Sequence, residues 1–282
     1  MRIAELIHRS ASRLTAASID DTRLETEVLM AYVLGIDRAH LLARLADELD
    51  ADTNVRFDAV LARRIAHEPL AYITRHREFY GIDFACRPGA LIPRPETEML
   101  VEIALDEILR RGDALRIADV GTGSGAIAVA IAVHAPRARV TAIDASDAAL
   151  TVARDNAARV GVADRIDLRT GDLLEDAGVF DVIVANLPYV GAAEWQELQP
   201  EIRDHEPREA LVGGPTGTEV IERLLRQAPA HLEAAGVLAA EMGYAHGARL
   251  LAVAGACFPD AEACVIKDVA GLDRVLLVRK GG

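Results

Sequence analysis

Residues 1–75 carry apolar side chains at helical spacing and show no alternation typical of strands. Ile3, Leu6, Ile7 and Leu14 recur on one helical face. A second apolar series follows Asp20 and Asp21 and stops at Gly35, which suits a helix C-terminus. Two more helices are expected over Asp37–Leu45 and Asp52–Ala66, the latter ended by Pro69. The pattern predicts a bundle of four or five short helices, and we expect a separate domain over residues 1–75.

Near residue 80 the spacing of apolar residues changes from the helical period to a period of two residues, which is typical of strands. Tyr80, Ile82, Phe84 and Cys86 alternate with small or polar residues. This alternation predicts a β-hairpin over roughly Ile73–Ala90. We therefore expect a linker at residues 76–95 between the helical bundle and the rest of the chain.

Strands and helices alternate from Pro95 to the C-terminus. The predicted strands are Leu115–Val120, Arg139–Asp144, Arg165–Arg169, Val179–Ala185, Gly236–Met242, Ala261–Ile266 and Arg274–Val278. The predicted helices between them are Glu96–Arg110, Ala126–Val133, Ala145–Val160 and Glu219–Leu232. Such alternation indicates an α/β domain, over residues 96–282, with a mostly parallel seven-stranded sheet. The connection Lys267–Asp273 is too short for a parallel crossover, so the last strand should run antiparallel.

A glycine-rich turn lies between the first of these strands and its helix. The turn Asp119–Gly125 reads DVGTGSG, and its glycines suit a sharp turn that a ligand approaches closely. Asp144 follows Gly125 by 19 residues, at the end of the next strand, where a carboxylate can accept hydrogen bonds from ribose hydroxyls. The turn and Asp144 predict a site for an adenosine-type cofactor.

The glycine turn does not by itself separate two cofactors. Gly121, Gly123 and Ala126 also satisfy the relaxed dinucleotide pattern of nicotinamide enzymes. The expected antiparallel last strand favours a sheet of the methyltransferase type, which is an argument by fold analogy. S-adenosylmethionine is therefore favoured over NAD.

A second motif, Asn186-Leu187-Pro188-Tyr189, follows the strand Val179–Ala185 directly. It is thus expected at the carboxyl edge of the sheet, where open α/β folds bind ligands. Pro188 restricts Leu187 to an extended conformation. The Leu187 carbonyl and the Asn186 side-chain oxygen can then grip the two hydrogens of a planar amino group, with Tyr189 packed on its plane.

An amide nitrogen needs such an arrangement because its lone pair is delocalised and it is a poor nucleophile. Two hydrogen bonds to fixed acceptors localise electron density on the nitrogen and aim it at an electrophilic methyl group. The sulfonium methyl of S-adenosylmethionine is such an electrophile. A strand-to-loop turn that contains Asn and Pro is also ordinary turn chemistry, so the functional interpretation depends on the motif lying in the same sheet as the glycine turn.

The two motifs together resemble those of class I S-adenosylmethionine-dependent methyltransferases with an [N/D]PP[Y/F] motif, although Leu187 stands where proline is common. These enzymes modify planar amino groups in adenine, cytosine or glutamine. Three further segments select among them: Leu91–Glu98 (LIPRPETE), Glu206–Leu211 (EPREAL) and Asp268–Arg274 (DVAGLDR). With the helical N-terminus, the whole chain resembles the release factor glutamine methyltransferases, the PrmC or HemK family.

The resemblance implies methyl transfer from S-adenosylmethionine, leaving S-adenosylhomocysteine, to the glutamine of the GGQ motif in class 1 peptide chain release factors. It implies that the cofactor is bound by Asp119, the turn residues Gly121, Thr122, Gly123, Ser124 and Gly125, and by Asp144, Asp172, Leu173 and Asn186. It implies a substrate site of Pro93, Arg94, Pro95 and Glu96 with Asn186, Leu187, Pro188 and Tyr189. The last four are the expected catalytic residues. The helical domain would bind the release factor.

Charge and composition weigh against other classes of partner. The formal net charge is −13, which disfavours a nucleic-acid adenine methyltransferase that carries the same four-residue motif, Asn186–Tyr189, called the tetrad below. A nicotinamide oxidoreductase would leave the tetrad without a role, and an inactive release-factor-binding protein would not need the glycine turn. The eight histidines show no ligand spacing, so we expect no metal. No apolar run or N-terminal signal points to a membrane, and we expect a cytoplasmic monomer active in translation termination.

Overall fold

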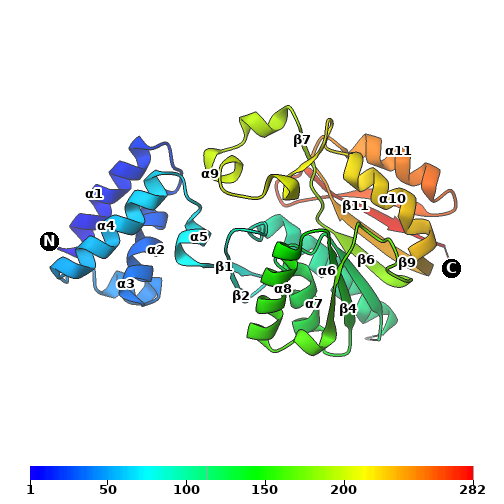
Figure 1. Cartoon of the computed structure of the whole chain (residues 1–282), viewed down its shortest axis with the longest axis horizontal. Helices are drawn as coiled ribbons and strands as arrows, with labels where there is room; N and C mark the ends of the chain where they lie inside the picture. Colours follow the sequence, from blue (N-terminus) through cyan, green and yellow to red (C-terminus); the bar gives the residue numbers. More distant parts are fainter. Residues whose placement is uncertain (113, 282) are drawn as a thin grey trace. The chain divides into compact units, whose positions relative to one another are not determined.

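The computed structural model describes residues 1–112 and 114–281 (Figure 1). Asp113 and Gly282, which fall within the domain expected over residues 96–282, lie outside the described residues. The chain forms two compact units. One consists of Met1–His76 together with Gln199–His205, and the other of Arg77–Leu198 together with Glu206–Gly282.

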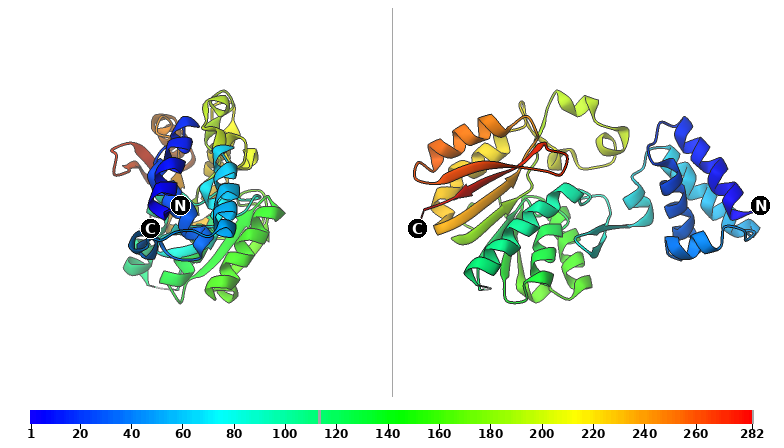
Figure 2. Two further views of the ribbon diagram at one scale, coloured as in Figure 1. Left: turned by 90° about the vertical axis from the view of Figure 1, so that its left-hand side faces the viewer. Right: turned by 180° about the vertical axis from the view of Figure 1, so that it is seen from behind.

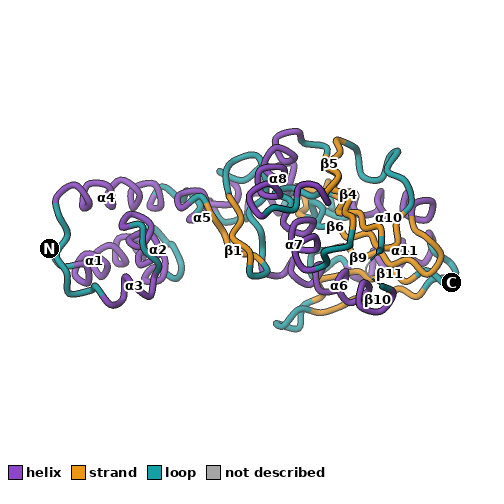
Figure 3. The backbone as a smooth tube through the Cα atoms, turned by 90° about the horizontal axis from the view of Figure 1, so that it is seen from below, coloured by secondary structure: helices purple, strands orange, loops and turns teal. Residues whose placement is uncertain are grey.

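The first unit is helical, as Figure 3 shows for residues 3–74. Its core includes Leu6 and Leu14, which the helical period had placed on one face, together with Leu29, Phe57 and Leu61, all fully buried. The helices are α1 (Ile3–Ala16), α2 (Thr22–Leu34), α3 (Arg38–Ala43), α4 (Ala51–Ile65), α5 (Leu70–Thr74) and the short α9 (Pro200–Arg203).

Local capping explains where the helices of the first unit begin and end. Asp37 caps α3 by accepting a hydrogen bond from the His40 amide, and Gly35 ends α2 in the left-handed conformation. The helix α4 is capped by Asp50 and stops at Ile65, within one residue of the predicted bounds at each end. The role predicted for Pro69 was wrong, because Pro69 precedes α5 and does not end α4.

The segment Gln199–His205 joins the helical unit through a buried arginine, which the sequence did not reveal. The guanidinium of Arg64, 3% exposed, is 2.5 Å from the carboxylate of Glu201. Arg64 also donates to both carboxylate oxygens of Glu25, at 2.5 and 3.0 Å. A charge that is removed from water needs such partners, so Arg64 fixes this segment on the helices.

The second unit is built on a seven-stranded sheet of order β10-β11-β9-β6-β3-β4-β5. The strands are β3 (Arg116–Val120), β4 (Arg139–Asp144), β5 (Ile166–Thr170), β6 (Phe180–Ala185), β9 (Leu232–Glu241), β10 (Glu262–Lys267) and β11 (Asp273–Arg279). The pairs among β5, β4, β3, β6 and β9 are parallel, whereas β11 is antiparallel to both β9 and β10. The predicted fold class is confirmed, including the antiparallel last strand.

Helices cover both faces of this sheet (Figure 2). The helices α6 (Glu98–Arg111), α7 (Ala126–His134) and α8 (Asp147–Val160) pack on one face, against residues such as Val140 and Val182. The helices α10 (Glu219–His231) and α11 (Gly247–Cys257) pack on the other, against residues such as Ile183 and Leu238. The sequence analysis did not predict α11. Within the described residues, none of the helices is long and apolar enough to cross a membrane.

A hairpin of β1 (His76–Phe79) and β2 (Ile82–Ala85) precedes the sheet. Tyr80 and Cys86, which the period-two pattern had included, lie outside these strands. Tyr80 sits in the turn with a positive φ of 50°, and Cys86 follows the end of β2. Asn156 on α8 holds the hairpin: its side chain accepts from the Ala85 amide at 2.8 Å and donates to the Ser124 carbonyl at 2.9 Å. The hairpin is thereby tied to the glycine turn.

The stretch after the tetrad, residues 190–217, is short strands and single helical turns. Two short strands, β7 (Val190–Gly191) and β8 (Val212–Gly214), pair in parallel. Between them lie η3 (Glu194–Glu197), α9 and η4 (Arg208–Ala210); η1 (Pro95–Thr97) and η2 (Ala163–Arg165) occur earlier in the chain. Residues 207, 209 and 210 of this stretch line the pocket that is described in the next section.

Candidate active site

A pocket of about 540 Å³ opens at the carboxyl ends of four parallel strands. Its wall includes the segments that directly follow β3, β4, β5 and β6, the place where open parallel sheets bind ligands. The volume suits an organic molecule of cofactor size. The lining residues are Gly89–Arg94, Thr97, Gly121–Ser124, Ala126, Ile127, Ile143–Ser146, Ala149, Gly171–Leu173, Asn186–Pro188, Pro207, Glu209, Ala210 and Val220.

The glycine turn is shaped by contacts that side chains would obstruct. Gly121, Gly123 and Gly125 have φ angles of +73°, +55° and +79°, in the region that favours glycine. A Cβ on Gly121 would lie 2.7 Å from Cδ2 of Leu187, and one on Gly125 would lie 3.0 Å from the Ala153 Cβ. A Cβ on Gly123 would meet only the Gly121 carbonyl oxygen, at 3.9 Å. The first and third glycines therefore permit packing, and the second leaves open space beside the turn.

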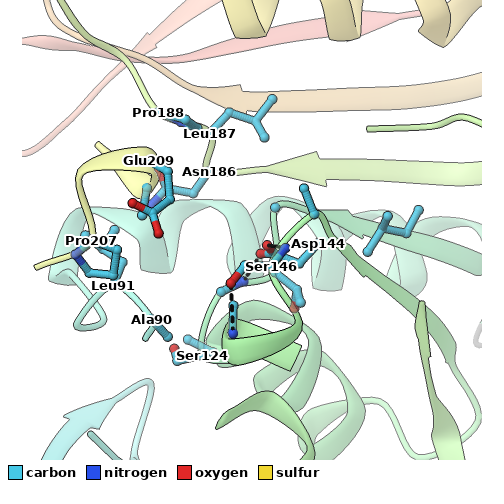
Figure 4. A pocket seen from close by; sticks show the side chains of 18 of the residues that line it. Ala90, Leu91, Ser124, Asp144, Ser146, Asn186, Leu187, Pro188, Pro207 and Glu209 are labelled. Atoms are coloured by element: carbon cyan, nitrogen blue, oxygen red, sulfur yellow. Dashed lines mark hydrogen bonds between the residues drawn. The ribbon is translucent and has the colours of Figure 1, made fainter. Parts of the chain in front are cut away.

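Asp144 faces the pocket and is held there by backbone amides (Figure 4). Its two carboxylate oxygens accept hydrogen bonds from Gly123 N and Ser146 N, each at 2.8 Å. Burial raises the pKa of Asp144, and these two amides oppose that rise by favouring the charged form. The cap of α8 is Ser146, whose hydroxyl accepts from the Ala149 amide, and not Asp144. Asp144 is therefore not explained as a helix cap.

Asp119 lies beneath the turn and outside the pocket lining. One of its carboxylate oxygens accepts from the Thr122 hydroxyl at 2.6 Å and from Ala128 N at 3.1 Å. Among the described residues its other oxygen has no hydrogen-bond partner. Complete burial, together with the nearby charge of Asp144, raises the pKa of Asp119 to about 7. Asp119 thus supports the turn from within the protein interior.

The residues after β5 form another part of the wall. Asp172 and Leu173 both line the pocket. Asp172 forms an ion pair with Arg223 of α10, and Leu173 is buried with a positive φ of 60°. The aliphatic side chain of Leu173 provides an apolar surface at this place.

The tetrad divides between the pocket and the protein interior. Asn186, Leu187 and Pro188 line the pocket, whereas Tyr189 lies outside its lining. The Asn186 side-chain amide donates to the Thr97 hydroxyl at 2.9 Å. The Tyr189 hydroxyl donates to the buried carboxylate of Glu241 at 3.0 Å, and burial raises the pKa of this phenol. The hydroxyl of Tyr189 therefore has a structural partner that the sequence analysis did not foresee.

Only two of the four substrate-site residues predicted in the PRPETE segment (Pro93–Glu98) line the pocket. Pro93 and Arg94 line the pocket; Pro95 and Glu96 lie outside the lining. Arg94 pairs with Glu206, whose carboxylate also accepts from the Ile92 amide at 3.1 Å. The Glu206 side chain is 1% exposed and that of Arg94 is 30% exposed. Glu206 therefore anchors residues 92–94 at the edge of the site.

Several site residues were missed by the sequence analysis. Thr97 belongs to PRPETE and was interpreted only as part of a helix start, while Glu206, Pro207, Glu209 and Ala210 belong to EPREAL, to which no chemistry was assigned. Glu241 could have been noticed in the sequence, because it is an acidic residue next to the end of the otherwise apolar predicted strand Gly236–Met242. Such a carboxylate is buried only when partners satisfy it.

The fold and pocket define a class I methyltransferase. Residues 5–74 match the family described as the PrmC N-terminal domain, and residues 94–205 match that described as ribosomal protein L11 methyltransferase (PrmA). The crystal structure of ribosomal protein L11 methylase from Lactobacillus delbrueckii subsp. bulgaricus is 26% identical, with a TM-score of 0.50. The match covers 69% of this chain and 83% of that one.

Curated relatives cover nearly the whole chain. The release factor glutamine methyltransferase of Moorella thermoacetica is 42% identical over 279 residues, 98% of this chain and 98% of that protein. The release factor glutamine methyltransferase of Koribacter versatilis is 42% identical over 247 residues, 86% of this chain and 87% of that protein. This chain belongs to the release factor glutamine methyltransferase family.

Proposed function

We propose that this enzyme transfers the methyl group of S-adenosylmethionine to the side-chain amide nitrogen of the glutamine in the GGQ motif of class 1 peptide chain release factors. The observation that carries the proposal is the position of Asn186 in the wall of a cofactor-sized pocket, with its amide NH₂ group turned toward Thr97. Such a reaction would act on translation termination, in the cytoplasm.

The residues present fit S-adenosylmethionine. Gly123 leaves space beside its backbone that a side chain would fill, and the Asp144 carboxylate lies in the pocket wall where ribose hydroxyls can donate to it. Asp172 and the apolar Leu173 would flank the adenine, and the turn Gly121–Gly125 would border the methionine part. When bound, the cofactor supplies an electrophilic methyl group on a sulfonium.

Asn186 and Leu187 would hold the substrate amide for attack. Because the Asn186 NH₂ group donates to Thr97, its Oδ1 is left to accept a hydrogen from the substrate nitrogen. The Leu187 backbone carbonyl is the proposed second acceptor. Two fixed acceptors orient the nitrogen and oppose its amide resonance, and they cost no reorganisation during the reaction. The nitrogen loses its proton as its bond to the methyl carbon forms.

The remaining residues of the predicted site take supporting roles in this proposal. Pro93 and Arg94 border the entrance for the glutamine side chain, with Pro95 and Glu96 behind them. Asn186 Oδ1 and the Leu187 carbonyl together form the proposed amide clamp. Tyr189 follows them in the chain, and its hydroxyl donates to Glu241, which is linked to Asn186 through Thr97. The helical unit would contact the release factor. We expect a monomer that takes no nucleic-acid substrate.

The experiment that tests this function follows a labelled methyl group. The full-length enzyme is incubated with methyl-labelled S-adenosylmethionine and a class 1 release factor, and the modified residue is located by peptide mass spectrometry. We expect the label on the GGQ glutamine and none on a release factor with alanine at that position. Structured RNA and ribosomal protein L11 serve as competing substrates, and label on either of them in place of the release factor would overturn the proposal.

A further inference from the structure

A chain of hydrogen bonds runs from the pocket wall into the interior behind Asn186. The Asn186 Nδ2 donates to the Thr97 hydroxyl oxygen at 2.9 Å, and the Thr97 hydroxyl donates to Glu241 Oε2 at 2.7 Å. The other oxygen of Glu241 accepts from the Tyr189 hydroxyl at 3.0 Å. Thr97 and Glu241 are 4% and 1% exposed. These hydrogen bonds thus join three separate sequence segments through two buried residues.

The chemistry of these groups allows only one donor-to-acceptor direction along this series of hydrogen bonds. An ionised carboxylate can only accept hydrogen bonds, so Glu241 in its charged form requires both hydroxyls to point their protons toward it. The Thr97 oxygen, having donated its proton, retains lone pairs that can only accept. An amide NH₂ group satisfies that oxygen and an amide carbonyl does not. The side chain of Asn186 is therefore held with Nδ2 inward, which leaves Oδ1 for the pocket.

We propose that Glu241 and Thr97 are positioning residues that fix the orientation of the Asn186 amide and so present Oδ1 to the nitrogen that is methylated. This inference rests on the proposed function for its catalytic consequence, but the orientation itself can be measured independently. Without these hydrogen bonds, the Asn186 side-chain amide could rotate by half a turn and present its NH₂ group to the substrate NH₂ group. Two donors would then face each other and the clamp would lose one acceptor.

Burial and several neighbouring groups act on the pKa of Glu241, and together they raise it above the ordinary value of a glutamate. Burial raises its pKa, and the charge of Glu96 acts in the same direction. The Thr97 and Tyr189 hydroxyls and the positive charge of Arg274 act in the opposite direction. Arg274 is itself held by Asp268, which accepts from its guanidinium at 3.0 Å. The DVAGLDR segment thereby places a positive charge near Glu241.

The first test uses the Thr97→Val and Thr97→Ser variants in a double-mutant cycle with Asn186→Ala. Valine has nearly the shape of threonine without its hydroxyl, and serine keeps the hydroxyl. In single-turnover methylation of a release factor, Thr97→Val should lower the rate about tenfold, the scale of one lost hydrogen bond. Thr97→Ser should keep most of the rate. In the Asn186→Ala background, Thr97→Val should cause no further loss, because the group it positions is absent.

A merely structural role predicts a different result. If Thr97 only supported the fold, Thr97→Val would lower the rate by the same factor with and without Asn186. Equal factors in the two backgrounds would therefore overturn the proposal. Glu241→Gln should lower the single-turnover rate as Thr97→Val does, and it should likewise cause no further loss in the Asn186→Ala background. Affinity for S-adenosylmethionine, measured by calorimetry, should change less than twofold in Thr97→Val.

The second test reads the Asn186 amide directly and needs no activity. The chain contains three asparagines, at positions 54, 156 and 186, so ¹⁵N-asparagine labelling gives few side-chain NH₂ signals, and Asn186→Ala assigns one of them. The Asn186 NH₂ protons should exchange with solvent at least tenfold faster in Thr97→Val than in the wild type or in Thr97→Ser. Equal exchange in all three would refute the positioning role. A wild type that shows protected protons but leaves release factor unmethylated would refute only the proposed function.

Discussion

The side chain of Leu187 lies directly against Gly121: its Cδ2 is 2.7 Å from the position that a Cβ on Gly121 would occupy. The two residues belong to the tetrad and to the glycine turn, at the ends of the neighbouring strands β6 and β3. Leucine, at the position where the tetrad commonly has proline, thus links the two motifs by packing.

Gly121→Ala should destabilise the protein for two reasons, a positive φ of +73° and the contact with Leu187. Gly161 offers a matched control, because its φ is +77° and a Cβ there would meet none of the described residues within 4 Å. We expect each substitution to cost about 1 kcal/mol for the backbone and Gly121→Ala to cost about 1 kcal/mol more for crowding. Urea unfolding measures both, and equal costs would show that the Leu187 contact is unimportant.

Arg94→Met should destabilise the segment around residues 92–94 because it leaves the buried Glu206 carboxylate without its charged partner. We expect a loss of about 2 kcal/mol in the free energy of unfolding. Adding Glu206→Gln should recover part of that loss, since the amide carries no charge. Chemical denaturation of the single and double variants checks this. A double variant less stable than Arg94→Met alone would contradict the pairing as the cause.

Asp144→Asn should weaken the binding of S-adenosylmethionine by about 1–3 kcal/mol, because the ribose hydroxyls lose a charged acceptor. Ser146→Ala is the control from the same pocket wall: it removes the cap of α8, at the Ala149 amide, and leaves the Asp144 carboxylate in place. Calorimetry should show a much smaller change for this control. If both variants bind the cofactor as the wild type does, Asp144 is not the ribose ligand.

The stability of the wild type should fall as pH rises toward neutrality, because of Asp119. Its pKa is raised from 3.8 to about 7 in the folded protein. Between these values the folded state holds a proton that the unfolded chain has lost, so raising the pH favours unfolding. The contribution is at most about 1.4 kcal/mol per pH unit and ends above the folded pKa. Thermal or urea unfolding from pH 5 to 8 should show a smaller fall for Asp119→Asn, and parallel curves would contradict this assignment.

The sequence predicted the fold well where a single period dominates. The strand Arg139–Asp144 was predicted with its observed ends, because apolar alternation and the flanking turn residues agree. The helix α11 was missed, since Gly247–Cys257 contains two glycines and many alanines and gives little periodic contrast. The boundaries of the hairpin moved because Tyr80 turns where the pattern continues.

The site was predictable to the extent that its residues are consecutive in the sequence. Asn186 and Asp144 each follow a buried strand, so their place at the carboxyl edge follows from the topology alone. The roles of Thr97, Glu206 and Glu241 depend on contacts across 89 to 144 positions, as in the bonds of Asn186 and Glu241 to Thr97. Residue spacing carries no information on such pairs, and only the folded chain brings them together.

The most direct test of the account is the single-turnover rate of methyl transfer to a release factor by Asn186→Ala at saturating S-adenosylmethionine. If Asn186 Oδ1 accepts a hydrogen from the reacting amide, the rate should fall by about two to three orders of magnitude, the scale of losing one preorganised hydrogen-bonding group at a reacting centre. Cofactor affinity should change far less. Near-wild-type transfer by Asn186→Ala would contradict the amide clamp, even in an enzyme that methylates release factors.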